Sequence, residues 1–488
     1  MKDFPTLATS FASVVIMNII LASVALANSA APLSAMMPKL VGTKSILGSE
    51  PRIEASGLTP GQRVRVHAVR MFSTWERAPS GSWRQAARPL HSWADFLADK
   101  DGRINLWRTG PLAGTYNGID GYGILWSGRP IKPAVPDIFL PKGESFERMK
   151  DGETMIFLAI ENDVVDRRMF TTAQAPGIKL VDIAKGRLNG AYAAPVDGQK
   201  HPVLILLHGS EGGDRDSARA MALRFAGQGY AAFAFNYFAW DLKKLEGVPN
   251  AHVNQPIEMI TAVRDWLSAQ PEADVSRLGL YGHSKGAEYA EVAAIYLPWV
   301  RAVAACVPTD VVWQGYGIGD ERNRTNAYGA PPKEYSSFSW KGRPLPYIPL
   351  EGDRSGYFHN TDFYEAKRRE HAAKAASAAI RIEKSKASFL WLGGGRDETW
   401  ASGEMALRLD RRLRSKGAAD RSELHIYEAA GHAICGDGTY PTRLWAQDSV
   451  DPRDPDRDAE GRATVDAWNR IKTFFSQTLN RSGTNSPI

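Results

Sequence analysis

Residues 278–288 read LGLYGHSKGAE, and this stretch decides the fold of the second half of the chain. Residues 278–281 are predicted to form a short strand and residues 285–297 a helix, so Gly-His-Ser-Lys-Gly at 282–286 makes the turn between them. In such a turn the serine adopts a strained backbone conformation, and only small neighbours let the strand and the helix come so close. The G-x-S-x-G spacing arises by chance in long chains, but its position between a strand and a helix predicts that Ser284 is a nucleophile.

Strands and helices alternate on both sides of this turn. The further strands that we expect lie at residues 202–207, 231–235, 303–307, 388–392 and 423–427. The further helices that we expect lie at residues 216–228, 256–269 and 459–479. Alternation of this kind is typical of a mostly parallel sheet that helices cover on both faces. Together with the serine turn, it predicts an α/β fold, with an α/β-hydrolase catalytic domain over residues 177–482.

An imidazole and a carboxylate follow the last two predicted strands. A serine hydroxyl is a poor nucleophile until a base takes its proton, and in this fold the order along the chain is Ser, then Asp or Glu, then His. His432 comes shortly after the strand at 423–427 and is the predicted base. Asp397, in the glycine-rich turn GGGRDETW at 393–400, is the predicted acid that fixes the imidazole tautomer. Glu398 is the neighbouring alternative for the acid.

Two backbone N–H groups are predicted to form an oxyanion hole. One belongs to Lys285, the residue after the nucleophile. The second comes from the loop HGSEGG at 208–213, whose glycines let N–H groups turn inward. Ser210 or Glu211 supplies this second N–H, and Ser210 is favoured. A phosphate-binding loop is the competing interpretation, but the G-K-[ST] ending of such a loop is missing.

The region before the catalytic domain has a different pattern. Residues 63–69 and 154–160 alternate as strands do, turn-rich pieces separate such runs, and helical periodicity first occurs at residues 91–100. Residues 39–172 are therefore predicted to form a small antiparallel β-sandwich domain. Within the catalytic domain, residues 308–387 interrupt the alternation, and such an excursion is expected to form a lid or a pocket wall over the site.

The first 27 residues have the layout of a secretory signal peptide. Lys2 precedes an apolar run at residues 11–26, and Ala-Leu-Ala at 25–27 is a small-x-small cleavage pattern. We therefore expect an exported protein, periplasmic or secreted, without stable membrane insertion after cleavage; an uncleaved anchor is the alternative. The two cysteines, Cys306 and Cys435, could pair in an oxidising compartment, but the sequence leaves their pairing open.

Composition narrows the class of protein. A chain of 488 residues with 43% hydrophobic and 23% charged residues is ordinary for a globular protein and long enough for two domains. The net charge of +6 is spread along the chain without a block of Lys and Arg, which argues against nucleic-acid binding. There is no C-x-x-C pair and no histidine at ligand spacing, so neither a metal site nor a cofactor is expected. The oligomeric state stays open.

Several short motifs occur in a fixed order along the chain. They are GLTPGQ at 57–62, GTYNGIDGYGILWS at 114–127, HGSEGG at 208–213, GHSKGAE at 282–288, GRDETW at 395–400, GH at 431–432, and VDAW at 465–468 followed by FF at 474–475. In this order they resemble the acyl-CoA thioesterase and bile acid-CoA:amino acid N-acyltransferase family, over nearly the whole chain after the signal peptide. The resemblance implies a β-sandwich domain, an α/β-hydrolase domain and an acyl-enzyme mechanism. Family thioesterases use serine as the nucleophile and the amino acid transferases use cysteine, so Ser284 favours hydrolysis.

These observations predict a serine-dependent hydrolase of acyl thioesters or carboxylic esters, whose partner is a small-molecule acyl substrate. Family members with known roles are mostly intracellular and act on acyl-CoA, which an exported protein would seldom meet. The resemblance therefore carries over the type of reaction more safely than the substrate. Two alternatives remain: an acyltransferase that moves the acyl group to an amine, and a catalytically inert binding or scaffold protein.

Overall fold

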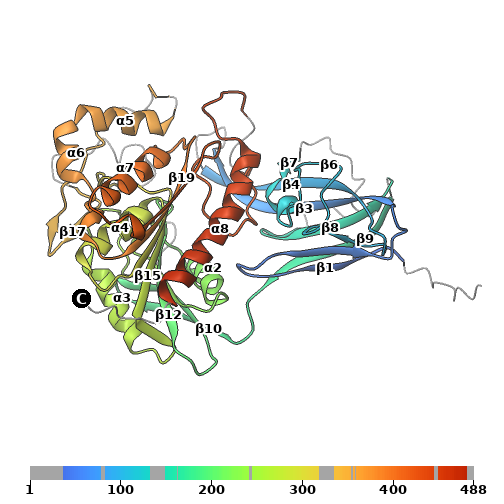
Figure 1. Cartoon of the computed structure of the whole chain (residues 1–488), viewed down its shortest axis with the longest axis horizontal. Helices are drawn as coiled ribbons and strands as arrows, with labels where there is room; N and C mark the ends of the chain where they lie inside the picture. Colours follow the sequence, from blue (N-terminus) through green and yellow to red (C-terminus); the bar gives the residue numbers. More distant parts are fainter. Residues whose placement is uncertain are drawn as a thin grey trace, which may run out of the picture. The chain divides into compact units, whose positions relative to one another are not determined.

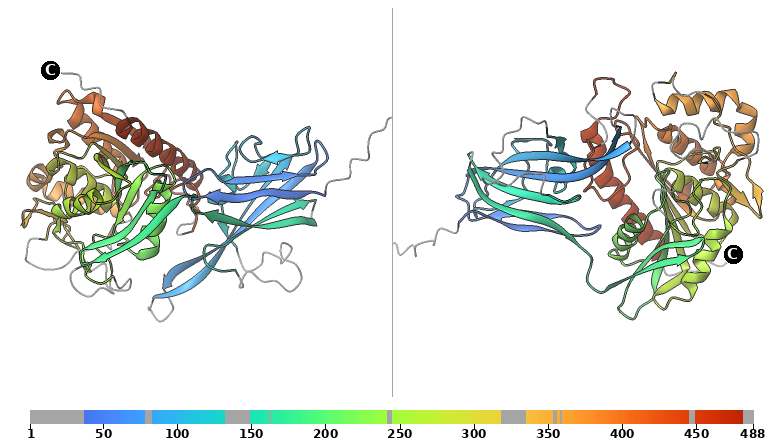
Figure 2. Two further views of the ribbon diagram at one scale, coloured as in Figure 1. Left: turned by 90° about the horizontal axis from the view of Figure 1, so that it is seen from below. Right: turned by 180° about the vertical axis from the view of Figure 1, so that it is seen from behind.

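The computed structural model describes residues 37–77, 83–131, 149–161, 163–240, 245–317, 335–352, 356–357, 359–444 and 449–480. The predicted signal peptide at residues 1–27 lies outside these residues. Over the described ranges, no helix combines the length and the apolar character needed to cross a bilayer. Figure 1 labels the elements, and Figure 2 shows them from two further directions.

The first sheet is built from residues 39–173, before the catalytic domain. Among the described residues it contains nine strands: β1 (Lys39–Ile46), β2 (Arg52–Ser56), β3 (Arg63–Arg77), β4 (Trp83–Leu97), β5 (Ile104–Asn105), β6 (Ala113–Gly114), β7 (Arg129–Pro130), β8 (Thr154–Ile160) and β9 (Asp163–Ala173). Their order is β5-β2-β1-β9-β8-β3-β4-β6, with β7 also paired to β4. β1 and β9 run parallel over residues 44–46 and 171–173, which departs from the antiparallel arrangement that we predicted. Side chains from β1, β2, β3, β4 and β8 share one hydrophobic core with the short helix α1 (Gly123–Trp126).

The helical periodicity at residues 91–100 predicted the wrong structure. Most of this segment belongs to β4, which pairs with β3 from Leu97 opposite Arg63 to Trp83 opposite Arg77. Ser92, Ala94 and Phe96 all point into the core, as expected for alternate residues of a strand. Pairing along a long neighbouring strand therefore outweighs the local helical pattern.

The second sheet carries the serine turn at its centre. In the described part of the chain its strands are β10 (Ile178–Lys185), β11 (Leu188–Pro195), β12 (His201–Leu207), β13 (Ala231–Phe235), β15 (Ala273–His283), β16 (Ala302–Cys306), β19 (Ser388–Gly394) and β20 (Ser422–Tyr427). Their order is β10-β11-β13-β12-β15-β16-β19-β20. The pairs β10·β11 and β11·β13 are antiparallel, and all the others are parallel. The carboxyl ends of the parallel strands therefore lie along one edge, which is where sites form in sheets of this kind.

Helices cover both faces of this sheet, as Figures 1 and 2 show. The helices are α2 (Arg215–Ala226), α3 (Glu258–Ser268), α4 (Lys285–Tyr296), α7 (Ser402–Arg414) and α8 (Arg457–Leu479), and a 3-10 turn, η6 (Ala419–Arg421), precedes β20. Helices α3, α4 and α7 share a core with Val203, Ile205 and Leu207 of β12. Helices α2 and α8 share a second core with Leu204 and Leu206 of the same strand. The continuous apolar run in β12 thus reflects burial on both sides.

Between β16 and β19 the chain leaves the sheet. The described elements there are β17 (Phe338–Trp340), β18 (Arg343–Pro344), α5 (Asn360–Glu370), α6 (Ala372–Ala378) and the 3-10 turn η5 (Ile382–Lys384); β17 also pairs with β14 (Gln255–Pro256). Trp313, Phe363 and Tyr364 of this excursion pack in one cluster with Trp400. The excursion therefore lies against the turn after β19, which also contains Asp397.

Candidate active site

Ser284 lies at a sharp turn between β15 and α4. Its backbone has φ 53° and ψ −123°, a conformation that residues other than glycine rarely adopt. The backbone N–H of Ser284 donates to the carbonyl of Cys306 at 3.0 Å, which ties the turn to the end of β16. A Cβ at Gly282 would lie 2.1 Å from the carbonyl oxygen of Gly286, and one at Gly286 would lie 2.2 Å from that of Leu207. Glycine is therefore required at both positions.

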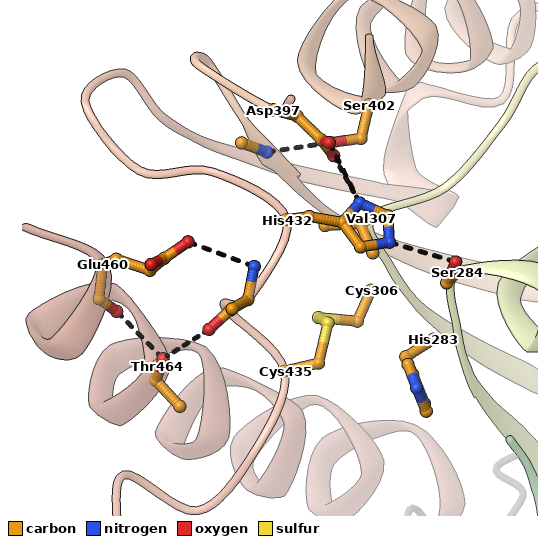
Figure 3. The surroundings of a disulfide bond; sticks show 12 residues. His283, Ser284, Cys306, Val307, Asp397, Ser402, His432, Cys435, Glu460 and Thr464 are labelled. Carbon is orange, nitrogen blue, oxygen red and sulfur yellow. Dashed lines mark hydrogen bonds and ion pairs between the residues drawn. A yellow bond between two sulfur atoms is a disulfide. The ribbon is translucent and has the colours of Figure 1, made fainter. Parts of the chain in front are cut away.

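His432 connects Ser284 to Asp397, and the three side chains come from the ends of three strands (Figure 3). The Nε2 atom of His432 lies 3.0 Å from Ser284 Oγ, and its Nδ1 lies 2.8 Å and 3.0 Å from the two carboxylate oxygens of Asp397. Ser284 and Asp397 are each only 5% exposed. These distances suit the tautomer with the proton on Nδ1, which leaves Nε2 free to accept the proton of the serine hydroxyl.

The carboxylate of Asp397 is fixed by three other hydrogen bonds. The backbone N–H groups of Thr399 and Trp400 donate to Oδ1 at 2.9 Å and 3.2 Å, and the hydroxyl of Ser402 donates to Oδ2 at 2.5 Å. Glu398, the alternative acid, takes another position, because its carboxylate accepts the backbone N–H of His432 at 3.3 Å. The structure therefore pairs the imidazole with Asp397 and not with Glu398.

The pKa of His432 is raised above its ordinary value. Burial lowers the pKa of this imidazole, but the charge of Asp397 and the hydrogen bond to it raise the pKa by more. Glu398 and Glu460 add smaller contributions in the same direction. The surroundings therefore favour the imidazolium, the form that His432 takes after it accepts the serine proton.

The loop at 208–213 lies directly beside the serine turn. A Cβ added to Gly209 would lie 2.9 Å from Nε2 of His283. Glu211 accepts the backbone N–H of Gly209 at 2.9 Å, and its carboxylate lies 3.3 Å from His283 Nε2. The carbonyl of Ser210 accepts the indole N–H of Trp240 at 3.1 Å. The loop that contains both predicted donors, Ser210 and Glu211, is thus held next to the nucleophile.

The side chain of Lys285 forms an ion pair with Glu288. Its Nζ is buried and lies 2.7 Å from Oε2 of Glu288 and 3.1 Å from the hydroxyl of Ser337. The other carboxylate oxygen of Glu288 accepts the backbone N–H of Trp313 at 3.0 Å. This buried ion pair joins the start of α4 to the excursion.

Three family models match the chain. The model described as "Acyl-CoA thioester hydrolase/BAAT N-terminal region" matches residues 49–149, and "BAAT / Acyl-CoA thioester hydrolase C terminal" matches residues 257–436. A model of the dienelactone hydrolase family matches residues 188–314. Curated relatives include acyl-coenzyme A thioesterase 2 (mitochondrial) and thioesterase 5, both of Mus musculus. Each is 26% identical to this chain, and the matches cover 79% and 81% of it and 79% and 88% of the relatives.

The chain belongs to the acyl-CoA thioesterase and bile acid-CoA:amino acid N-acyltransferase family. Members of this family are α/β-hydrolases, and this member is an enzyme of the hydrolase class. Solved structures with a similar chain path include a putative dienelactone hydrolase of Klebsiella pneumoniae, with 16% identity, a TM-score of 0.38, and coverage of 62% of this chain and 99% of that one. Another is an acylaminoacyl peptidase of Pyrococcus horikoshii, with 12% identity, a TM-score of 0.41, and coverage of 92% and 64%.

In this thioesterase-family chain, α8 holds the loop that carries the base. Oε1 of Glu460 accepts the backbone N–H of Ala433 at 3.1 Å, and the hydroxyl of Thr464 donates to the carbonyl of Ala433 at 3.1 Å (Figure 3). Arg457 binds the second oxygen of Glu460 at 2.7 Å. The residue next to His432 is therefore anchored on both its N–H and its carbonyl.

A disulfide joins Cys306 to Cys435, with the two Cα atoms 6.0 Å apart. The sequence left open whether the two cysteines pair, and the structure shows that they do. Cys306 is the last residue of β16, and Cys435 follows His432 by three residues. The disulfide thus lies between the strand next to the serine turn and the loop that bears the base (Figure 3).

Sequence reasoning missed three residues that support the site of this family member. Ser402 binds the acid, Glu460 binds the base loop, and Glu288 neutralises Lys285. Ser402 begins α7, a helix that was not predicted, so no pattern in the sequence singled it out. Within the described residues, no group of three or more His, Cys, Asp or Glu side chains is placed to hold a metal ion.

Proposed function

We propose that the protein is a serine hydrolase of acyl thioesters or carboxylic esters that acts through a covalent acyl-enzyme. One observation carries this proposal: an unbroken line of contacts from Ser284 Oγ through His432 to the carboxylate of Asp397. Membership of a hydrolase family is consistent with it. Serine as the nucleophile favours hydrolysis over transfer, since water can release the acyl group without a second bound substrate.

The proposed acylation step begins when Ser284 Oγ attacks the carbonyl carbon of the substrate. His432 Nε2 takes the hydroxyl proton, and Asp397 stabilises the resulting imidazolium. The carbonyl oxygen becomes an oxyanion that accepts hydrogen bonds from the N–H of Lys285 and from the N–H of Ser210 or Glu211. When the tetrahedral intermediate collapses, the bond to the thiol or alcohol breaks, and His432 returns the proton to this leaving group.

The proposed deacylation step repeats the same sequence with water. His432 removes a proton from a water molecule, whose oxygen attacks the acyl carbon of the acyl-enzyme. The second tetrahedral intermediate releases the carboxylic acid, and the proton on His432 returns to Ser284 Oγ. The enzyme is then restored without any consumed cofactor.

The substrate class follows from the relatives and from the expected location. The curated relatives are named acyl-coenzyme A thioesterases, which supports an acyl thioester as substrate. We also propose that the protein is exported to the periplasm or secreted, because residues 1–27 have the pattern of a signal peptide. The disulfide supports this location, since disulfides persist in oxidising compartments. Carboxylic esters are therefore included beside acyl-CoA.

The deciding experiment compares Ser284→Ala with the wild type on acyl-CoAs and acyl esters of graded chain length. Ser276→Ala is a matched control, because Ser276 is an exposed serine on the same strand, β15. Ser284→Ala should abolish turnover and labelling by a fluorophosphonate probe, and Ser276→Ala should retain both. Full activity of folded Ser284→Ala would refute the proposal. A folded wild type that neither turns over nor labels would favour the inert scaffold, and amide formed from added amines would favour the transferase.

A further inference from the structure

The Cys306–Cys435 disulfide connects two segments that each orient one member of the triad. Cys306 accepts the backbone N–H of Ser284 at 3.0 Å, and the register of β15 and β16 places it opposite His283. Cys435 lies on the loop of His432, three residues further along the chain. The covalent bond therefore runs from β16, the strand next to the serine turn, to the loop that carries the base (Figure 3).

In the described part of the chain, backbone hydrogen bonds hold residues 432–433 of this loop but not the three residues that follow them. On one side, His432 and Ala433 donate their backbone N–H groups to Glu398 and Glu460. On the other side, the backbone N–H groups of residues 434–436 have no hydrogen-bond acceptor among the described residues. Beyond Ala433 the disulfide is the covalent tie of this loop, beside the buried side chain of Ile434 and the ion pair of Asp437 with Arg224 at 2.9 Å.

We propose that this disulfide is a positioning element for His432, so that the enzyme is fully active only when the bond is closed. The inference rests on the proposed hydrolase function. The contact that it protects is short: Nε2 must stay 3.0 Å from Ser284 Oγ while Nδ1 stays 2.8 Å from Asp397. A displacement of about 1 Å at such a centre can cost about a hundredfold in rate. Reduction adds two electrons and two protons to the disulfide and gives two separate thiols, which removes the covalent link between the loop of His432 and β16.

The bond can be removed in two ways. The first is the double variant Cys306→Ala/Cys435→Ala, which removes both sulfur atoms. The second is treatment of the wild type with dithiothreitol, which gives two electrons and two protons to the disulfide and is itself oxidised to its cyclic disulfide. The chain has only two cysteines, so the reductant acts on this bond alone. A disulfide that closes a long loop also stabilises the fold as a whole. Val303→Ala is therefore the matched control, because Val303 is buried on the same strand but packs on the opposite face of the sheet.

The readouts separate positioning from general stability. At a temperature where every sample is folded, loss of the disulfide should lower kcat about tenfold to a hundredfold and change KM by less than about threefold. The pKa seen in the pH profile of kcat/KM should fall toward the ordinary value of imidazole, because a loosened His432 loses part of its contact with Asp397. Val303→Ala should lower Tm without changing kcat or this pKa.

The same imidazole can be followed without turnover. Nitrogen NMR of labelled histidines, with His432→Asn to assign the signal, gives the pKa of His432 in the oxidised and reduced protein. If the double variant and the reduced wild type keep the wild-type kcat and the wild-type pKa of His432, the positioning role is refuted while the hydrolase function stands. If the oxidised wild type is inactive, the hydrolase function fails, and the NMR titration still decides whether the disulfide holds His432 against Asp397.

Discussion

Asp397→Asn should remove most of the activity while leaving the fold intact. In the wild type, Oδ1 accepts the N–H groups of Thr399 and Trp400 and lies 3.0 Å from Nδ1 of His432, whereas Oδ2 accepts from Ser402 and lies nearer to Nδ1, at 2.8 Å. An asparagine would keep its carbonyl oxygen toward the two N–H groups, so its amide nitrogen would face Nδ1. That nitrogen donates, so the imidazole would take the tautomer with its proton on Nε2 and could not accept the proton of the serine hydroxyl. A triad held in the wrong tautomer loses about 10⁴-fold in rate, equivalent to about 5.5 kcal/mol.

The assay is kcat/KM on an activated acyl ester, with Tm as a check on folding. Glu398→Gln is the matched control, because Glu398 is the adjacent acid and contacts only the backbone N–H of His432 within the triad. It should lose less than about tenfold, as expected for one weakened hydrogen bond. A folded Asp397→Asn with activity close to that of the wild type, together with a large loss in Glu398→Gln, would show that the two acids have the opposite roles.

Three further outcomes follow from the same contacts. The kcat/KM of the wild type should rise with pH through the pKa of His432, since only the neutral imidazole accepts a proton; burial lowers this pKa, but Asp397 raises it above the ordinary value of about 6.5. A pH profile with its midpoint below that value would contradict this. Lys285→Met should lower the free energy of unfolding, measured in urea, by about 3–5 kcal/mol, because the buried carboxylate of Glu288 loses its cation. The double variant Lys285→Met/Glu288→Leu should recover part of that free energy. Ser402→Ala should lower kcat about tenfold to a hundredfold, since a hydrogen bond to a charged group contributes about 1.5–3 kcal/mol, and an unchanged kcat would show that the two N–H donors suffice.

The parts of the molecule that local sterics and chain order control were predictable from the sequence. Gly282 and Gly286 predicted a sharp turn at Ser284 that only small neighbouring residues permit, and the structure has that turn. Six strands of the second sheet were read from apolar runs, and each begins and ends within two residues of the expected position except β15, which starts five residues earlier. The antiparallel strands β10 and β11 were not predicted. Because parallel strands end at one edge, the order of Ser284, Asp397 and His432 along the chain was enough to place them together.

Features that depend on tertiary contacts were not predictable in this way. The choice between Asp397 and Glu398 depends on the shape of one turn, and both are acids at adjacent positions. The contact of Glu460 with the base loop needs the packing of α8, which its sequence pattern does not specify. The disulfide needs the distance between β16 and a loop after β20, and no spacing within the chain gives that distance. The helix expected at 91–100 was a wrong prediction, because pairing with β3 decides the structure of this segment. β3 lies too far away in the sequence to contribute to a local pattern.

The positive φ of Ser284 bears on the choice between an enzyme and a scaffold. A side chain in such a region costs about 1–3 kcal/mol of folding free energy, and glycine at the same position would avoid most of this. A protein selected only to hold a partner would be more stable without a hydroxymethyl group at residue 284. The chain instead keeps a destabilising residue where its oxygen lies 3.0 Å from an imidazole nitrogen, and the proposed nucleophilic role accounts for that cost.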